Sequence, residues 1–144
     1  MKADAKTQAE VVEVLNRFAE GNAKRDWNTI RPIFASDPDV VLVGTGKDEK
    51  RIGLNEIKTQ AERDWAQSES AEISFGWTSV SASGNVAWVA SDATIRAKAG
   101  GQEIALTGRL TAVLERRGGK WLIVQLHFSL PAGGQAEGES FPTG

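Results

Sequence analysis

The chain of 144 residues contains no cysteine and has a net charge of −2, with 17 basic and 19 acidic residues spread along it. This length suits one domain with a sizeable core, and the missing cysteine excludes disulfides, thiolate nucleophiles and cysteine zinc sites. The sequence lacks the basic stripe of a nucleic-acid binder, the apolar core of a signal peptide and the roughly 20 apolar residues of a membrane span. A soluble cytoplasmic protein with no nucleic-acid or membrane partner is expected.

The first part of the chain has the spacing of two helices. Apolar residues recur at helical intervals between Val11 and Phe18, and Gly21 can end that helix. Asp26 can cap a short second helix with apolar residues on one face. Pro32 lies within this second segment and should kink or shorten it.

A short strand and a third helix follow. The stretch SDPD breaks the chain before the strand Val40–Gly44. The next residues, TGKDEKR, are predicted as a polar loop, and their spacing does not match a phosphate-binding loop. From Gly53 to about Gln67, apolar residues lie along one face of an expected helix.

From about residue 70, the hydrophobic pattern changes from helical to alternating. Three longer strands are expected to end near Val80, Ala99 and Glu115, and KWLIVQLHFS forms a fourth. The separators SASGN, AGG and RRGG are typical of tight antiparallel turns. This order predicts an α+β fold in which three N-terminal helices pack on a curved, mainly antiparallel sheet. Residues 1–131 would form this single domain, and the Gly-rich residues 132–144 a flexible tail.

Alternation assigns each strand a side that faces the helices and an outer side. On the last strand, Leu122, Val124, Leu126 and Phe128 share the side expected to face the helices, and Trp121, Ile123, Gln125, His127 and Ser129 share the other. On the strand before it, Arg109, Thr111 and Val113 are expected on the outer side. For the strand that ends at Ala99, the preferred register turns Trp88 and Asp92 inward.

This predicted outer side is too apolar to remain in water, and a second copy of the same sheet is its simplest cover. The expected homodimer interface contains Arg109, Thr111, Val113, Trp121, Ile123, Gln125, His127 and Ser129. His127, the only histidine, is interpreted as part of this interface, since a His–Ser pair on one strand is not by itself a nucleophile–base arrangement. Its protonation in mildly acidic solution, close to Arg109, would weaken the dimer.

Four segments together resemble the SnoaL-like branch of the nuclear transport factor 2-like superfamily. They are AEGNAKRDWNTIRPIFASDPDVVLVGTG, the helix start GLNEI with Trp65, the strand GNVAWVASD and the ending GRLTAVLERRGGKWLIVQLHFSLP, within residues 8–131. The ending and the GL…W helix are also similar to the association domain of calcium/calmodulin-dependent kinase II. The resemblance implies a cone-like α+β barrel with an inward pocket at Ile30, Ile57, Asp92, Ala112 and Phe128. Four of these five residues are apolar or small, which favours an apolar pocket over an anion site.

The predicted pocket would hold a small organic molecule. Its expected lining is Phe18, Trp27, Ile30, Phe34, Ile57, Trp65, Trp88, Ala112 and Phe128, although such aromatic residues can also be core. Asp92 is the catalytic candidate, because an apolar pocket raises the pKa of a carboxyl toward neutral pH, and the resemblance implies pocket aspartates in that role. Alternatively, Asp92 bonds a backbone amide or an arginine, and a register shift of one residue would turn it outward.

Two classes of function stay open, because this fold does not decide function. The resemblance implies an enzyme that transfers protons in an isomerase, cyclase or dehydratase reaction. The alternative is a ligand-binding or association module without turnover. No cofactor is expected, and no metal site is expected in a chain with one histidine and no cysteine.

Overall fold

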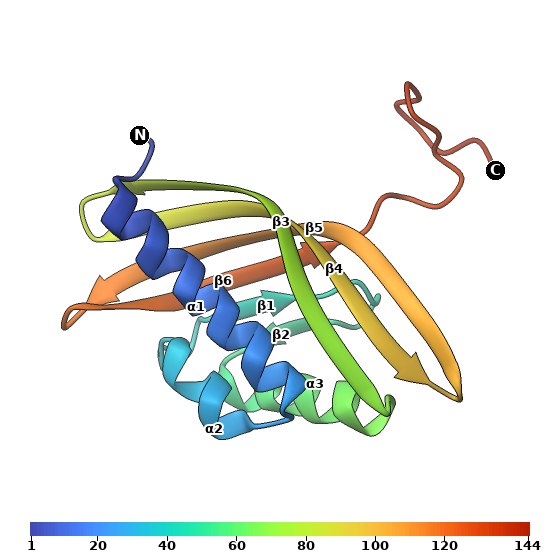
Figure 1. The fold of residues 1–144 in the computed structure, drawn as a ribbon, viewed down its shortest axis with the longest axis horizontal. Coiled ribbons are helices and arrows are strands. Elements are labelled where there is room, and N and C mark those ends of the chain that lie inside the picture. Colours follow the sequence, from blue (N-terminus) through green and yellow to red (C-terminus); the bar gives the residue numbers. More distant parts are fainter.

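Three helices pack against one side of a six-stranded sheet (Figure 1). The computed structural model describes residues 1–144. In chain order the elements are α1 (Ala5–Ala23), α2 (Trp27–Ile30), a 3-10 turn (Arg31–Ile33), β1 (Val41–Val43), β2 (Lys50–Ile52), α3 (Leu54–Ala66), β3 (Ser70–Ser83), β4 (Val86–Ala99), β5 (Gln102–Arg117) and β6 (Lys120–Ser129). The expected α+β fold, with helices first and a four-stranded meander last, is confirmed.

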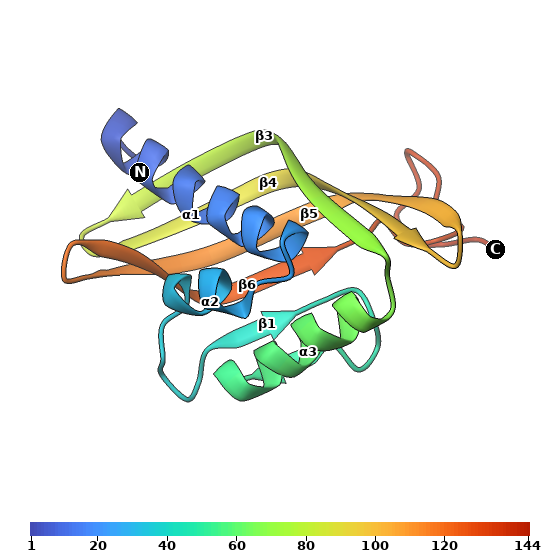
Figure 2. The ribbon, with the colours of Figure 1, turned by 60° about the horizontal axis from the view of Figure 1, so that its bottom comes forward.

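The strand order is β2-β1-β6-β5-β4-β3, and every neighbouring pair is antiparallel except β1 and β6, which are parallel. The sheet curves around the helices but is not closed into a barrel, so β2 and β3 remain its two edges (Figure 2). After β6, residues 130–144 contain no helix or strand and lead away from the sheet (Figure 1). Their flexibility stays a prediction.

Local sequence explains the helix boundaries. The side chain of Asp4 accepts a hydrogen bond of 2.7 Å from the backbone N–H of Thr7 and so caps α1. Pro32 ends α2 after one turn, and the chain continues as the 3-10 turn. None of the helices has the length and the apolar content that are needed to cross a bilayer.

The segment predicted as a polar loop contains a strand that the sequence pattern did not reveal. Lys50–Ile52 forms β2, which pairs with β1 so that Val41 lies opposite Ile52 and Val43 opposite Lys50. The charged residues of β2 lack the apolar alternation of a typical strand. Backbone hydrogen bonds to β1 therefore decide its conformation, and the resulting hairpin extends the sheet beside α3 (Figure 2).

A bulge in β6 decides which of its side chains face the helices. Val113 of β5 pairs with Gln125, but the next residue, Leu114, pairs with Ile123. Val124 is therefore an extra residue with no partner of its own, and the alternation of sides reverses there.

As a consequence, Trp121 and Ile123 face the helices together with Leu126 and Phe128. Trp121 is 5% exposed and Ile123 is fully buried in the core. The expectation that these two residues lie on the outer side is wrong, as is the inward side expected for Leu122. The expectation assumed strict alternation along the whole strand. A bulge cannot be recognised from the hydrophobic pattern of the strand alone.

The inner side of β4 carries small residues. Ala87, Val89, Ser91 and Ala93 are buried, and their neighbours Trp88 and Asp92 lie on the outer side. Ser91 is paired with Leu110, which is also buried, and partners in register share one side of a sheet. The preferred register, which turned Trp88 and Asp92 inward, is therefore wrong. Small inner side chains leave space between the sheet and the helices.

Gly108 of β5 allows a close approach that any side chain would prevent. A Cβ atom at this position would collide with the backbone oxygen of Ser129. We predict that Gly108→Ala destabilises the fold by about 1–3 kcal/mol, because the β5–β6 pairing must shift. Denaturant unfolding would measure this. Gly133→Ala, where a Cβ would meet no atom within 4 Å, serves as the control. Equal stability of the two variants would contradict the prediction.

Candidate functional site

A cavity of about 300 Å³ lies between α3, the end of α1, the β1–β2 hairpin and the inner side of the sheet. We call it the helix–sheet cavity. Its volume is at the lower end of the range of small-molecule sites. Most of its wall is apolar, with Leu42, Ala61, Ile73, Ala93, Ile95, Ala97, Leu106, Leu110 and Leu126 among the lining residues.

Six of the nine residues predicted to line a pocket lie at this cavity. They are Phe18, Trp27, Ile30, Ile57, Trp65 and Phe128. Phe34 is buried behind Phe18, with the two ring centroids 6.1 Å apart, and Ala112 is buried in the core. Trp88 lies on the outer side of the sheet. Contact of the six residues with a ligand stays a prediction.

Asp92 does not reach the cavity. It lies exposed on the outer side of β4, opposite Arg109 of β5. Its neighbours Ser91 and Ala93 are the residues of this strand that face the helices. The expected position of Asp92 inside the pocket is therefore wrong, and its proposed role as a pocket acid loses its structural basis.

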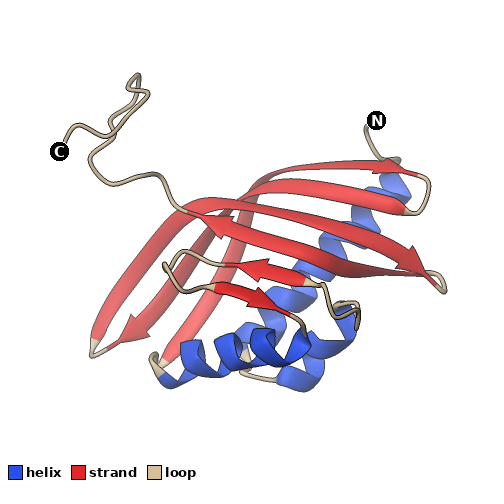
Figure 3. Cartoon of the chain, turned by 180° about the vertical axis from the view of Figure 1, so that it is seen from behind, coloured by secondary structure: helices blue, strands red, loops and turns tan.

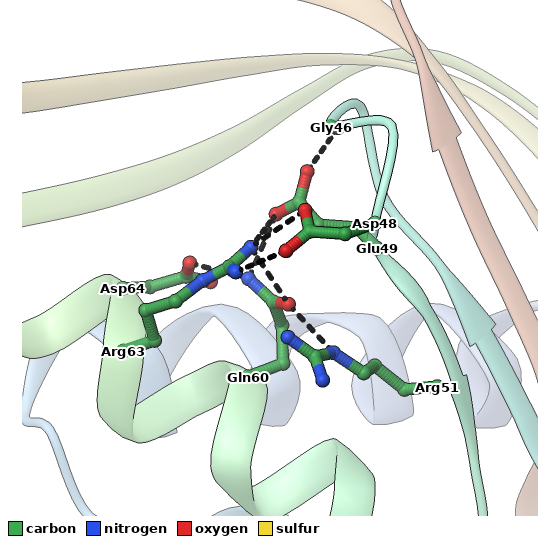
Figure 4. A network of polar contacts seen from close by, with 7 residues as sticks. All are labelled: Gly46, Asp48, Glu49, Arg51, Gln60, Arg63 and Asp64. Atoms are coloured by element: carbon green, nitrogen blue, oxygen red, sulfur yellow. Dashed lines mark hydrogen bonds and ion pairs between the residues drawn. The ribbon is translucent and has the colours of Figure 1, made fainter.

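The cavity has one polar end, organised around Gln60 of α3 (Figure 4). Gln60 is 4% exposed, and its Nε2 donates hydrogen bonds of 2.7 Å to Glu49 Oε1 and of 2.7 Å to Asp64 Oδ1. Its Oε1 accepts from Arg51 Nε at 3.0 Å and from Arg63 Nη2 at 3.3 Å. All hydrogen-bonding positions of the amide are thus used. Carboxylates on one side and guanidinium groups on the other fix its orientation.

Glu49 and Asp48 connect the β1–β2 hairpin to α3 (Figure 4). The second oxygen of Glu49 accepts from the backbone N–H of Gly46, so both of its oxygens have partners. Arg63 Nη1 lies 2.7 Å from Asp48 Oδ2, and Nη2 lies 3.6 Å from Glu49 Oε1. The hydrogen bond from Arg63 lowers the pKa of Asp48. These contacts hold the hairpin at the polar end of the cavity.

Asp64 differs from Glu49 because only one of its oxygens has a partner. Gln60 donates to Oδ1, and Oδ2 has no hydrogen bond within the protein. Asp64 lines the cavity, although the residue as a whole is exposed to solvent. Partial burial of its carboxyl raises the pKa, the hydrogen bond from Gln60 opposes the rise, and the charge of Glu49 adds to it. Asp64 is therefore the acid–base candidate of the cavity.

Sequence reasoning missed Gln60 and Asp64. Their spacing of four residues places them on one face of α3, which is a signal that the sequence contains. The same pattern is typical of a solvated helix face, and only the hairpin packed against α3 distinguishes the two cases.

Arg25 fixes the end of α3 at the cavity. Its backbone φ is 55°, and its guanidinium donates hydrogen bonds to the backbone oxygens of Trp65 at 2.5 Å and Ser68 at 2.6 Å. These bonds satisfy carbonyl groups at the C-terminal end of the helix. The indole N–H of Trp65 is buried without an acceptor. The positions of Asp64 and Trp65 thus depend on a residue between α1 and α2.

No helix covers the outer side of β3–β6 (Figure 3). Of the residues predicted for a dimer interface, Arg109, Thr111, Val113, Gln125, His127 and Ser129 lie on this side. Arg109 Nε donates to Ser129 Oγ at 3.4 Å. Two tryptophans also lie there, beside a shallow groove: Trp88, and Trp77 with an exposed fraction of 63%. Sequence reasoning did not single out Trp77, because a second register shift, between Phe75 and Thr78, determines its side.

Solved structures of other proteins share this fold. A nuclear transport factor 2-like superfamily protein from Salmonella enterica serovar Typhimurium is similar with a TM-score of 0.83 and 21% identity, covering 96% of this chain and 100% of that chain. A candidate dehydratase of the same family from Streptomyces avermitilis has a TM-score of 0.82 and 18% identity, covering 90% and 100%. A candidate calcium/calmodulin-dependent protein kinase II association domain from Xanthomonas campestris has a TM-score of 0.77 and 23% identity, covering 92% and 95%.

The fold is therefore that of the nuclear transport factor 2-like superfamily. Within it, the model of the SnoaL-like domain matches residues 11–133, and the chain belongs to this family. The comparison with curated proteins finds no match. At these identities the solved structures establish the fold alone, so function has to be argued from the cavity.

The raised pKa of Asp64 predicts a pH-dependent effect on stability. The folded protein holds this proton more tightly than the unfolded chain, whose carboxyl has the ordinary value of 3.8. The stabilisation of the folded state by this bound proton is therefore lost as the pH rises above 3.8. We predict that Asp64→Asn raises the melting temperature relative to the unchanged protein, and more at about pH 7.5 than at about pH 4. Thermal unfolding at both pH values measures the difference. A gain that is larger at the lower pH would contradict the prediction.

Proposed function

We propose that the protein binds a small, mostly apolar organic molecule in the helix–sheet cavity and transfers a proton on it, with Asp64 as general acid or base. One observation carries this proposal: an apolar cavity of about 300 Å³ meets a carboxyl group that has one oxygen free of any protein partner. Glu49, the other ionisable residue that lines the cavity, has protein partners on both of its oxygens. Asp64 thus takes the role that the sequence had suggested for Asp92.

The chemistry follows from the surroundings of Asp64. General acid–base catalysis is most effective when the pKa of the group lies near the working pH, and burial moves Asp64 in that direction. Gln60 occupies Oδ1, which leaves Oδ2 available to a bound molecule. Isomerisation, cyclisation and dehydration all need a proton to be removed from or delivered to a carbon or oxygen atom. The candidate dehydratase among the structural relatives supports the last of these.

The competing function is a binding or association module without turnover. The observation in its favour is the uncovered outer side of the sheet with Trp77, together with the likeness to the candidate association domain from Xanthomonas campestris. Both functions are compatible with a homodimer, which we propose to form through this outer side. A cytoplasmic location also stays a prediction.

The dimer proposal rests on apolar area. Trp88 lies opposite Val113 in register, and Trp77 and Val86 are exposed beside them. Full burial of a large apolar side chain contributes about 1.5–3 kcal/mol, and a standard interface buries about 800 Å² per partner. Arg109, Thr111, Gln125, His127 and Ser129 would supply polar contacts between the apolar ones. Trp121 and Ile123, which belong to the core, no longer take part.

The function is tested by binding and turnover. A thermal-shift screen of small apolar compounds should give hits that raise the melting temperature, since a ligand stabilises the state that binds it. Ala97→Phe should abolish binding, because its side chain would fill the cavity that Ala97 lines. Ala105→Phe, on the exposed outer side of the neighbouring strand, should not. If a hit is converted to product, Asp64→Asn should stop conversion while binding remains.

Two results of this experiment would count against the proposal. If Ala97→Phe binds the hits as well as the unchanged protein, the helix–sheet cavity is not the site. If Asp64→Asn converts a substrate at the unchanged rate, Asp64 is not the acid or base. Binding without conversion of any hit would favour the binding module.

The dimer is tested separately. Sedimentation at tens of micromolar should show about twice the monomer mass for the unchanged protein. Trp77→Glu should give monomers, because a charge on the apolar outer side cannot be buried without a partner. Lys58→Glu, at an exposed position of α3, should leave the dimer intact. A monomeric unchanged protein at this concentration would overturn the proposal.

A further inference from the structure

The charged residues that line the helix–sheet cavity are all acidic. Glu49 and Asp64 are the only ionisable residues among the lining residues, and no lysine, arginine or histidine is present there. Asn22, Thr45, Gln67 and Ser68 supply the other polar side chains besides Gln60. A bound molecule therefore meets negative charge at the polar end and apolar walls elsewhere.

Three guanidinium groups lie close to the cavity, but each is engaged elsewhere. Arg25 donates to backbone oxygens at the end of α3, and Arg51 donates to Gln60 Oε1. Arg63 is paired with Asp48 and also donates to Gln60. None of the three belongs to the cavity lining. A ligand anion therefore meets no positive side chain in the cavity lining.

From this arrangement we propose that the cavity selects ligands whose polar group is a hydrogen-bond donor, an ammonium or a hydroxyl group, and excludes carboxylates. The inference rests on the proposed binding function and specifies the class of ligand. The free Oδ2 of Asp64 accepts the donor. A carboxylate in the same place would be repelled by Asp64 and Glu49 and would find no positive side chain in the cavity lining to pair with.

The shape and walls of the cavity describe the rest of the ligand. Trp27 and Trp65 lie at the walls with Phe18 and Phe128, so flat aromatic or alicyclic bodies are suitable. The volume of about 300 Å³ suits a body of about two fused rings rather than a long chain. The expected ligand is thus a compact apolar body with one donor group.

Matched probes test this directly. They share a naphthalene body and differ in one substituent: 1-naphthylmethylamine, 1-naphthylmethanol, 1-naphthoic acid and 1-methylnaphthalene. Ligand-observed NMR titration at about pH 7 measures each dissociation constant, since the amine is then a cation and the acid an anion. We expect the amine to bind at least about tenfold more tightly than the acid, with the alcohol between them.

Two variants of equal charge change separate the cavity from the overall charge of the protein. Asp64→Asn should reduce the preference for the amine over the acid to about threefold or less. Asp92→Asn removes the same charge from the outer side of the sheet and should leave the preference unchanged. Circular dichroism checks that both variants fold.

The outcomes are distinct. An acid that binds as tightly as the amine overturns the inference while leaving a binding cavity in place. Equal losses of preference in Asp64→Asn and Asp92→Asn also overturn it, because the selection would then come from overall charge. If no probe binds, including 1-methylnaphthalene, the proposed binding function itself fails and the inference fails with it.

Discussion

Val124 is the extra residue of the bulge in β6, and it determines which side of the sheet carries the side chains that precede it. The composition of both faces of the sheet depends on this bulge. Without this bulge, Trp121 and Ile123 would point away from the helices, and the core below α1 would lose two large side chains. With it, Trp121 and Ile123 fill the core, and Leu126 and Phe128 line the cavity. Bulges of this kind bend a strand and increase its twist, which agrees with the curvature of the sheet.

The inner side of β4 explains why the space between helices and sheet remains partly open. Ala93 and Ala97 both line the cavity, and their small side chains leave part of it unfilled. The β1–β2 hairpin closes one end of the helix–sheet cavity. Packing alone does not hold this hairpin, because its strand β2 is charged; instead, Glu49 is bonded to Gln60.

This polar connection also shapes the electrostatics of the cavity. Arg51 and Arg63 donate to the oxygen of Gln60, and the nitrogen of Gln60 donates to the carboxylates of Glu49 and Asp64. Arg63 also pairs with Asp48 and lies 3.6 Å from Glu49, but neither arginine belongs to the cavity lining. Glu49 and Asp64 are thus the charged residues that line the cavity. One neutral residue therefore determines both the structure and the chemical character of the polar end.

The amino-acid sequence by itself determined the helices, the four-stranded meander and the apolar character of the cavity, because these follow from local periodicity and from the resemblance of ordered segments to a known family. It also identified Phe18, Ile57 and Trp65, whose helices have one clear apolar face. Only the tertiary structure decided the sides of Asp92, Trp121 and Ile123, and only the tertiary structure brought Glu49, Gln60 and Asp64 together. The physical reason is the same in both cases: strand register, bulges and the packing of a hairpin on a helix are set by pairing between distant segments, and alternation within a single strand carries no information about its partner.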